Sequence, residues 1–517
     1  MKRRPLLVLA LALLLAPVWA ASLPAMAPKG AVFTLYLRNL AVKKAFFVDF
    51  QAELERQRLT AKDLLALFGD EELDPDAQAE LERFLKLASL DAVGQEGLLA
   101  VYPDGSFLAL ARPAASAAGS FFDELKKTLG ETKPYRGWNL KRLSQEGDEY
   151  ELVAGYREGT AVMAGFPAKG PSLAAQLFEG GGERGLELAL DGDLVLQIDF
   201  PPLAALAQPF LAGEDVPKRL AGLVRTPRRY ASALSVVKQG LEGKSVFALD
   251  RDADPELAGI LLKDCRPWPL ADFPKADSVA SYCFPLAEFA RYLNGLLGEL
   301  ELNLDLDLDA FGDRLALVSL TVPGQDPALA LQKPLGDLLI YLEAKDDLTA
   351  ETTLLTWLQV LAAAGTPEGE GGFQVERYEV GAYRGKRITL GIGQPVFLFN
   401  LGDRLVLATS EAAAQALAGP KLAEDPTYRR LAPRYPKDAV MLSYANAGPA
   451  IKLASEQLVA TMPMFAEDPK ELQAMMEFGQ RLAKFLAFVG ERVGAGIGYT
   501  RIEGDRRESY GLTEVRW

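Results

Sequence analysis

The sequence of 517 residues contains no histidine. This absence excludes nucleophilic triads that use histidine, paired-histidine zinc sites on a helix, and an imidazole base. Cysteine is also scarce, with two residues in the chain, and no apolar run beyond the N-terminal segment is long enough to span a membrane. We therefore expect no enzymatic activity, no cofactor and no bound metal.

Positive charge is in deficit: the chain has 56 Lys and Arg residues and 70 Asp and Glu residues, which gives a formal charge of −14. A surface of this sign repels nucleic acid at long range, so we expect no nucleic-acid partner. Apolar residues make up 49% of the chain, as in ordinary globular proteins. The length exceeds what one hydrophobic core usually supports, which predicts two or more cores.

The first 20 residues have the composition of a secretory signal peptide. Basic residues 2–4 precede the apolar segment 6–15, and residues 18–20 offer small side chains at the positions that signal peptidase reads. A second cleavage motif at residues 25–27 is poorer because Pro28 follows it. We expect a soluble periplasmic or secreted protein without a transmembrane span after cleavage. An uncleaved membrane anchor is the weaker alternative.

The two cysteines, Cys265 and Cys283, are 18 positions apart. In an exported chain such a pair is expected to form a disulfide. Closing this loop would stabilise the fold by roughly 3 kcal/mol in the chain-entropy picture. Two buried free thiols are the alternative.

Short motifs recur in the same order in two parts of the chain. The pentapeptide Leu-Asp-Ala-Val-Gly at residues 90–94 returns as Leu-Asp-Ala-Phe-Gly at 308–312, and each copy precedes an apolar run. Tyr-Arg-Gly occurs at 135–137 and at 383–385. Segments 235–249 and 498–512 both have the form strand, glycine-containing turn, strand. Chance similarity is the alternative, but the preserved order favours an internal duplication.

The predicted organisation is a signal peptide (1–20), a first α+β repeat (28–250), a Pro-rich linker (251–277) and a second α+β repeat (278–517). Each repeat should contain a mainly antiparallel sheet with helices on one face. Apolar spacing predicts strands over 31–40, 98–102, 107–111, 279–284, 338–343 and 405–408, and helices over 41–57, 60–68, 75–87, 121–129, 172–178, 286–300, 352–364 and 411–417.

Three motifs suggest chemistry but depart from the patterns that the chemistry requires. Ser235 and Lys238 have the spacing of a Ser-x-x-Lys hydrolase, yet valines between them favour a hairpin strand. Aspartates at 305, 307, 309 and 313 lack the glycine and glutamate of a calcium loop, which favours a solvated face. Basic clusters at 218–229 and 429–437 could bind an anionic polymer, but pairing with local acids is favoured.

The duplication also predicts a groove between the repeats. Tyrosine and arginine of the two Tyr-Arg-Gly motifs would occupy related positions, and a methionine-rich helical region could adapt to an apolar ligand. A methionine stripe in the protein core is the alternative. The proposed groove residues are Tyr135, Arg136, Tyr383, Arg384, Met462, Met464, Met475 and Met476.

The order of strand, helix, Leu-Asp-Ala-x-Gly, strands, helix, Tyr-x-Gly and meander, present twice in an exported chain, resembles a bacterial extracytoplasmic family known only as a domain of unknown function. The resemblance spans roughly residues 30–517. It implies a duplicated α+β fold and brings no catalytic residues. Our first hypothesis is a non-catalytic binding or scaffold protein of the cell envelope, with an envelope protein or polymer as partner. A carrier of an apolar or lipid ligand and a Ser/Lys hydrolase are the alternatives.

Overall fold

The computed structural model describes residues 22–59, 96–145, 148–169, 172–179, 183–211, 213, 216–300, 307–320, 337–365, 373–390, 395–461 and 469–517. The chain divides into two compact units. Unit 1 contains residues 1–214 and 227–249 together with Trp517, and unit 2 contains residues 215–226 and 250–516. The first pentapeptide and the helices expected over 60–68 and 75–87 lie outside the described residues.

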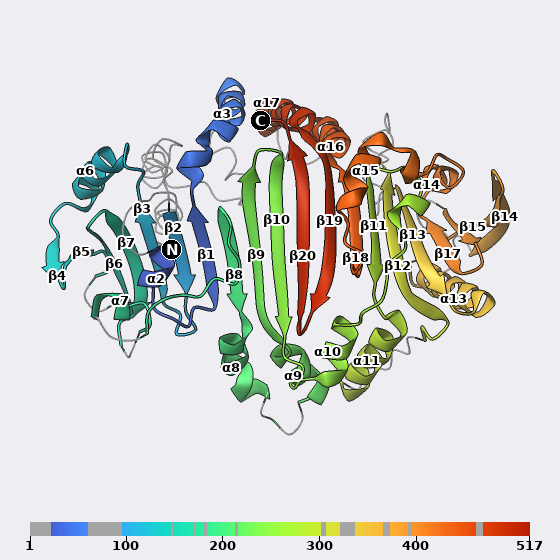
Figure 1. Cartoon of the computed structure of the whole chain (residues 1–517), viewed down its shortest axis with the longest axis horizontal. Helices are drawn as coiled ribbons and strands as arrows, with labels where there is room; N and C mark the ends of the chain where they lie inside the picture. The colour runs from blue at the N-terminus through green and yellow to red at the C-terminus, as the bar shows by residue number, and fades with distance from the viewer. Residues whose placement is uncertain are drawn as a thin grey trace. The chain divides into compact units, whose positions relative to one another are not determined.

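Unit 1 is built on an antiparallel sheet (Figure 1). The strands described in it follow one another across the sheet in the order β4 (Lys133–Tyr135), β5 (Trp138–Arg142), β6 (Tyr150–Arg157), β7 (Thr160–Pro167), β3 (Phe107–Arg112), β2 (Glu96–Val101), β1 (Phe33–Arg38), β8 (Leu194–Asp199), β9 (Pro227–Val237) and β10 (Gly240–Leu249). Most neighbours are consecutive in the sequence, and two-residue turns connect β4 to β5, β6 to β7 and β9 to β10. The turn between β2 and β3 has Gly105 at φ 79°, as its Pro-Asp-Gly sequence predicts.

The helices of unit 1 pack on both faces of its sheet. Among the described residues they are α2 (Leu23–Met26), α3 (Leu40–Arg56), α6 (Ala118–Leu129), α7 (Gln176–Glu179) and α8 (Phe200–Leu211). Phe121 and Leu125 of α6 pack with Ala109 of β3, whereas Phe178 of α7 packs in a separate core with Leu110 of the same strand. Neighbouring core residues of a strand point to opposite faces. The expectation of helices on a single face therefore does not hold in unit 1, because the central strands carry buried apolar side chains on both faces.

Unit 2 is also built on an antiparallel sheet. Its described strands follow the order β14 (Gln374–Val380), β15 (Tyr383–Thr389), β16 (Val396–Asn400), β17 (Arg404–Ala408), β13 (Asp337–Ala344), β12 (Phe311–Leu320), β11 (Ser278–Cys283), β18 (Met441–Asn446), β19 (Val493–Glu503) and β20 (Arg506–Val515). The helices are α9 (Lys218–Arg225), α10 (Pro255–Leu261), α11 (Leu286–Glu299), α13 (Asp347–Gly365), α14 (Glu411–Ala416), α15 (Pro426–Leu431), α16 (Ala447–Thr461) and α17 (Pro469–Arg492), with short 3-10 turns η1 (Leu270–Asp272), η2 (Leu422–Glu424) and η3 (Ala432–Arg434).

The segment expected to be a linker is part of the core of unit 2. Trp268 is 1% exposed and Phe273 is fully buried. The guanidinium groups of Arg314 and Arg404 lie 5.0 Å and 4.8 Å from the centre of the Trp268 ring, within the range of a cation–π interaction. These contacts fix the proline-containing segment against the strands of unit 2.

Corresponding strands of the two units follow one another across their sheets in the same order. If ten is added to each strand number of unit 1, the order across the sheet of unit 2 results. Helices also follow corresponding strands, with α3 after β1 and α11 after β11, and with α6 after β3 and α13 after β13. The α+β class and the antiparallel sheets are confirmed. Descent of both units from one duplicated ancestor stays a prediction.

Three local predictions differ from the structure. The helix expected over 172–178 is limited to Gln176–Glu179 and follows a turn. Gly243, expected in a hairpin turn, lies within β10, and the turn consists of residues 238–239. Strand β8 and helices α8 and α9 were not predicted, and in α8 three prolines interrupt the apolar spacing.

Candidate functional site

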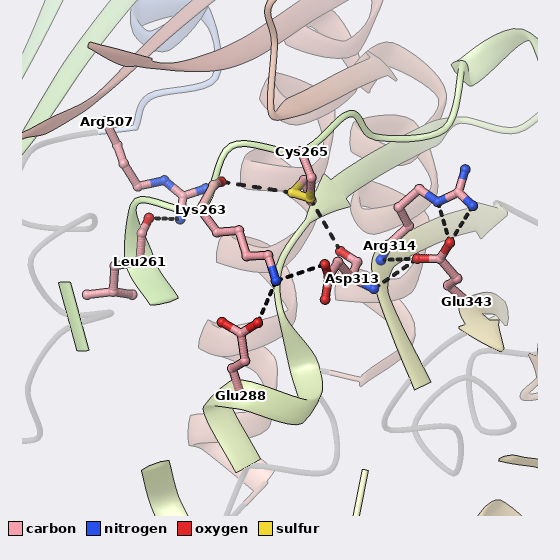
Figure 2. The surroundings of a disulfide bond; sticks show 9 residues. Leu261, Lys263, Cys265, Glu288, Asp313, Arg314, Glu343 and Arg507 are labelled. Carbon is pink, nitrogen blue, oxygen red and sulfur yellow. Dashed lines mark hydrogen bonds and ion pairs between the residues drawn. A yellow bond between two sulfur atoms is a disulfide. The ribbon is translucent and has the colours of Figure 1, made fainter. Parts of the chain in front are cut away.

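Cys265 and Cys283 form a disulfide in unit 2, with their Cα atoms 5.6 Å apart (Figure 2). Cys283 is the last residue of β11 and is buried, whereas Cys265 follows α10 and is half-buried. The sulfur of Cys265 lies 4.0 Å from the carbonyl oxygen of Asp313, at the start of β12. The bond therefore ties the segment after α10 to the end of β11, next to the start of β12.

Ionic and hydrogen-bond contacts hold the residues that precede Cys265. Figure 2 shows the ammonium group of Lys263 between two carboxylates, with Nζ 2.5 Å from Glu288 and 3.0 Å from Asp313. The hydrogen bond to Glu288, with further stabilisation from Asp313, raises the pKa of Lys263 above its ordinary value. Arg507 donates to the carbonyl oxygen of Leu261 at 3.1 Å. Together with the disulfide, these contacts stabilise the position of the segment against the rest of unit 2.

The two Tyr-Arg-Gly motifs lie at corresponding hairpins but not at equivalent positions. Tyr135 is the last residue of β4 and pairs across the turn with Trp138. Tyr383 is the first residue of β15 and pairs with Val380. The motifs thus stand on opposite sides of their turns, and the residue that corresponds to Tyr383 in the strand order is Trp138. The expectation of related positions for the two tyrosines is corrected accordingly.

The arginines of these motifs differ in the same way. Arg136 is in the turn itself, at φ 47°, whereas Arg384 is inside β15 and lies 3.4 Å from Glu379. Each pair belongs to a different unit, Tyr135 and Arg136 to unit 1 and Tyr383 and Arg384 to unit 2. A groove that combines them stays a prediction.

Of the methionines in the predicted groove, Met475 and Met476 are half-buried on α17, and Met462 and Met464 lie outside the described residues. Helix α17 packs along α16 at a close crossing, since a Cβ on Gly448 would lie 2.6 Å from the carbonyl oxygen of Gly490. Glycines allow this approach. The use of this helix pair as an apolar carrier site stays a hypothesis.

The motifs with weak chemical signals have ordinary structural surroundings. Ser235 lies in β9 opposite Glu242 of β10, and Lys238 is in the following turn. Asp313 pairs with Lys263, and no group of metal-ligating side chains occurs within the described ranges. In the two basic clusters, ion pairs join Arg219 to Glu256 and Glu299, Arg229 to Asp199, and Arg430 to Glu514.

Helix α8 carries an apolar surface that the sequence reading missed. None of its twelve residues, FPPLAALAQPFL, is charged, and none is buried. Leu203, Leu206 and Phe210 are 39%, 51% and 81% exposed. They are spaced at i, i+3 and i+7, so they form one ridge on the helix, which we call the α8 face. The signal that could have found it is a charge-free run with prolines at its second and third positions.

The other side of α8 is held by unit 1. Ala204, Ala207 and Leu211, also at i, i+3 and i+7, are half-buried. The ring of Phe200 meets that of Phe247 of β10 edge-on, with centroids 6.4 Å apart. In Figure 1, α8 continues from the end of β8 past the strands of its sheet. The helix is thus apolar on both sides, with one side attached and the α8 face exposed to solvent.

Comparisons with known proteins give little further information. No protein-family model and no curated protein matches the chain. Two crystal structures titled as crystal forms I and IV of TP0453 match with 9% and 10% identity, covering 45% and 47% of this chain and 80% and 86% of TP0453. The TM-score is 0.23 for each, which is too low to support an inference about fold or function. Among the described residues, no helix combines the length and apolar character needed to cross a bilayer.

Proposed function

We propose that the chain is an exported, non-catalytic binding protein of the bacterial cell envelope that uses the α8 face as its binding surface. The exposed ridge of Leu203, Leu206 and Phe210 carries this proposal. A helix that is apolar on all sides is normally buried, because exposed apolar area is unfavourable in water. A partner that covers the α8 face would remove this unfavourable exposure. We also propose membership of the duplicated extracytoplasmic family that the motifs resemble.

The disulfide supports the proposed location. Disulfides persist in oxidising compartments such as the periplasm and are reduced in the cytosol. Cys265 and Cys283 are the two cysteines of the chain, and they are bonded to each other. The basic and apolar N-terminal residues 1–20 provide the proposed route of export.

Export can be tested by trapping thiols in cells with a maleimide of high mass. The full chain is expected to be unlabelled unless it is first reduced, whereas a chain that lacks residues 2–20 is expected to remain in the cytosol and to be labelled at both cysteines. A variant with Ala at positions 265 and 283 controls for nonspecific labelling. Equal labelling of the full and shortened chains would contradict export.

The binding surface can be tested by fractionation of cells that produce the exported chain. The variant Leu206→Asp/Phe210→Asp is expected to lose its association with envelope fractions, because each aspartate would have to be desolvated on binding. Leu348→Asp is the matched control, since Leu348 of α13 is 72% exposed and lies outside the α8 face. Equal association of both variants and the wild-type chain would refute the α8 face as the binding surface.

A further inference from the structure

The α8 face contains no group that could form a polar contact with a partner. The side chains of Leu203, Leu206 and Phe210 present hydrocarbon and an aromatic ring, with no hydrogen-bond donor or acceptor. Interfaces between proteins normally surround their apolar centre with a polar rim. In α8, Gln208 is the one polar side chain among the twelve residues. The chemistry of the surface thus suits an apolar phase that requires no complementary hydrogen bonds.

The size of the α8 face also argues against a second protein chain as its occupant. With side chains of this type at about 150–200 Å² each, the exposed fractions of the three residues correspond to roughly 300 Å². A stable protein interface needs about 800 Å² from each partner. A lipid surface has no such minimum, because each side chain that enters it contributes independently in proportion to its apolar area.

We infer that the α8 face inserts into the surface of a zwitterionic phospholipid bilayer. This inference rests on the proposed binding role and names its partner. A helix of twelve residues is about 18 Å long, shorter than the hydrocarbon core of about 30 Å, so α8 lies along the interface rather than across it. Phe210, at 81% exposure, enters deepest.

The charge of the chain determines which lipid is preferred. Helix α8 has no basic residue to attract anionic headgroups, and the chain carries a formal charge of −14. Attachment therefore comes from apolar insertion and not from electrostatic attraction. Binding to phosphatidylcholine vesicles is independent of salt, whereas phosphatidylglycerol weakens binding at low ionic strength through repulsion and high salt restores it.

Insertion can be measured with a tryptophan placed at the tip of the α8 face. In the full chain, Phe210→Trp is expected to shift its emission to the blue on addition of phosphatidylcholine vesicles and to be quenched by lipids brominated on the acyl chains. Leu348→Trp, at an exposed site of α13, is the matched control and should show neither change. An unchanged emission of the Phe210→Trp variant would overturn the inference.

The contribution of the ridge can be measured by vesicle co-sedimentation. Leu206→Asp/Phe210→Asp is expected to lower the partition coefficient at least about tenfold, whereas Leu348→Asp leaves it unchanged. Both variants alter exposed side chains, and unchanged thermal unfolding would verify that they fold. Equal binding of the two variants would overturn the inference. A dimer that the double aspartate variant converts to a monomer would also overturn it and assign the α8 face to a second copy of the chain.

These results separate the inference from the proposed function. The chain could fail to bind vesicles while its envelope association still depends on Leu206 and Phe210. That outcome would refute the lipid partner and leave the proposed binding role intact. Labelling of the cysteines in the full chain would refute export, whatever the vesicle result.

Discussion

Arg112 and Glu96 form an ion pair in the interior of unit 1, with Nη1 2.9 Å from Oε2. They are cross-strand partners on β3 and β2, and Arg112 is 1% exposed. Nε of Arg112 donates to the hydroxyl of Thr160 on β7 at 3.0 Å. The carboxylate of Glu96 also accepts from the hydroxyl of Tyr36 at 2.8 Å and from the backbone N–H of Leu23 at 2.6 Å. One pair of charges therefore joins five elements of the unit, namely β1, β2, β3, β7 and α2.

Replacing Arg112 by Met is expected to lower the free energy of unfolding of unit 1 by about 3–5 kcal/mol, because the carboxylate of Glu96 would remain in the interior without its cation. Denaturant unfolding measures this change. Lys127→Met in α6 is the control, since the side chains of Lys127 and Glu124 are 78% and 35% exposed and lie 3.5 Å apart. Its expected cost is below about 0.5 kcal/mol. A similar small cost for Arg112→Met would show that the buried pair is not needed for stability.

Unit 2 has an ion pair between the corresponding strands, β12 and β13. The acidic residue is on the second strand and the basic residue on the first, the reverse of unit 1. Arg314 follows Gly312 of the second pentapeptide by two positions, as Glu96 follows Gly94 of the first. Arg314 on β12 donates through Nε to Glu343 on β13 at 2.8 Å. The repeated pentapeptide thus precedes an interstrand ion pair in both units, although the sign of each charge is reversed.

Gly312 allows the carboxylate of Glu343 to approach the backbone of β12 closely. A Cβ at that position would lie 2.2 Å from a carboxylate oxygen of Glu343, which accepts hydrogen bonds from the backbone N–H groups of Asp313 and Arg314. Gly312→Ala is expected to displace the carboxylate and to lower the free energy of unfolding of unit 2 by about 1–3 kcal/mol. Thermal or denaturant unfolding measures the effect.

The control for this substitution is Gly298→Ala. Gly298 is in α11, and a Cβ there would meet no atom within 4 Å. Alanine is expected to stabilise the helix by up to about 1 kcal/mol, because it has the higher helix propensity. Opposite signs for the two substitutions are expected. A stabilising effect of Gly312→Ala would contradict the proposed need for close approach.

Local signals in the sequence predicted the elements whose ends are determined by single residues. Helix α6 ends before Gly130, which has φ 65°, and the hairpin of β19 and β20 turns at Gly504, with φ 61°. These turn and helix-end predictions succeeded because turn and cap preferences act over a few residues. The repeated motifs predicted the α+β class, which is confirmed, and an internal duplication, which stays a prediction.

Predictions that depended on packing between distant segments were less successful. The two Tyr-Arg-Gly motifs are identical in sequence, but Tyr135 precedes the turn of its hairpin and Tyr383 follows the turn of the corresponding hairpin. Residues 215–226 belong to unit 2, where the hydroxyl of Tyr292 of α11 lies 3.1 Å from the carbonyl oxygen of Arg219 and the guanidinium of Arg219 pairs with Glu256 and Glu299. No local pattern encodes these contacts. The α8 face was missed because exposure of an apolar helix is decided by what packs beside it.

The bidentate pair of Arg430 and Glu514 predicts a pH-dependent contribution to the stability of unit 2. The nitrogen–oxygen distances are 2.5 Å and 2.7 Å. Hydrogen bonding from Arg430 lowers the pKa of Glu514 below its ordinary value of 4.5. A lowered carboxyl pKa stabilises the fold above the pKa of the unfolded state, and this stabilisation is lost as the pH falls through the folded value.

Glu514→Gln is therefore expected to be less stable than the wild-type chain at pH 7 and equally stable in strong acid, where both side chains are neutral. Because Arg430 is 55% exposed, the difference should stay below about 1 kcal/mol. Urea unfolding over a series of pH values measures it. Arg430→Met should remove the same dependence, and the double variant should add little more. A difference that persists unchanged in acid would contradict this assignment.

Trp517 packs against α3 of unit 1, where its ring centroid lies 5.3 Å, 5.7 Å and 6.0 Å from those of Phe46, Phe47 and Phe50. Its Nε1 donates to the carbonyl oxygen of Val237 on β9 at 3.1 Å. The side chain thus connects a helix to a strand through both apolar and polar contacts. Trp517→Ala should destabilise unit 1 by about 1–3 kcal/mol, less than for a fully buried tryptophan because the residue is half-buried.

Trp517→Phe separates the two contributions, since phenylalanine keeps an aromatic ring next to α3 and lacks the donor. We expect it to recover most of the loss, leaving about 1 kcal/mol for the missing hydrogen bond. Phe210→Ala serves as the control in the same unit, because its side chain is mostly exposed and its removal should change stability by less than about 0.5 kcal/mol. If Trp517→Phe were as unstable as Trp517→Ala, the hydrogen bond to Val237 rather than the aromatic cluster would hold α3 to the sheet.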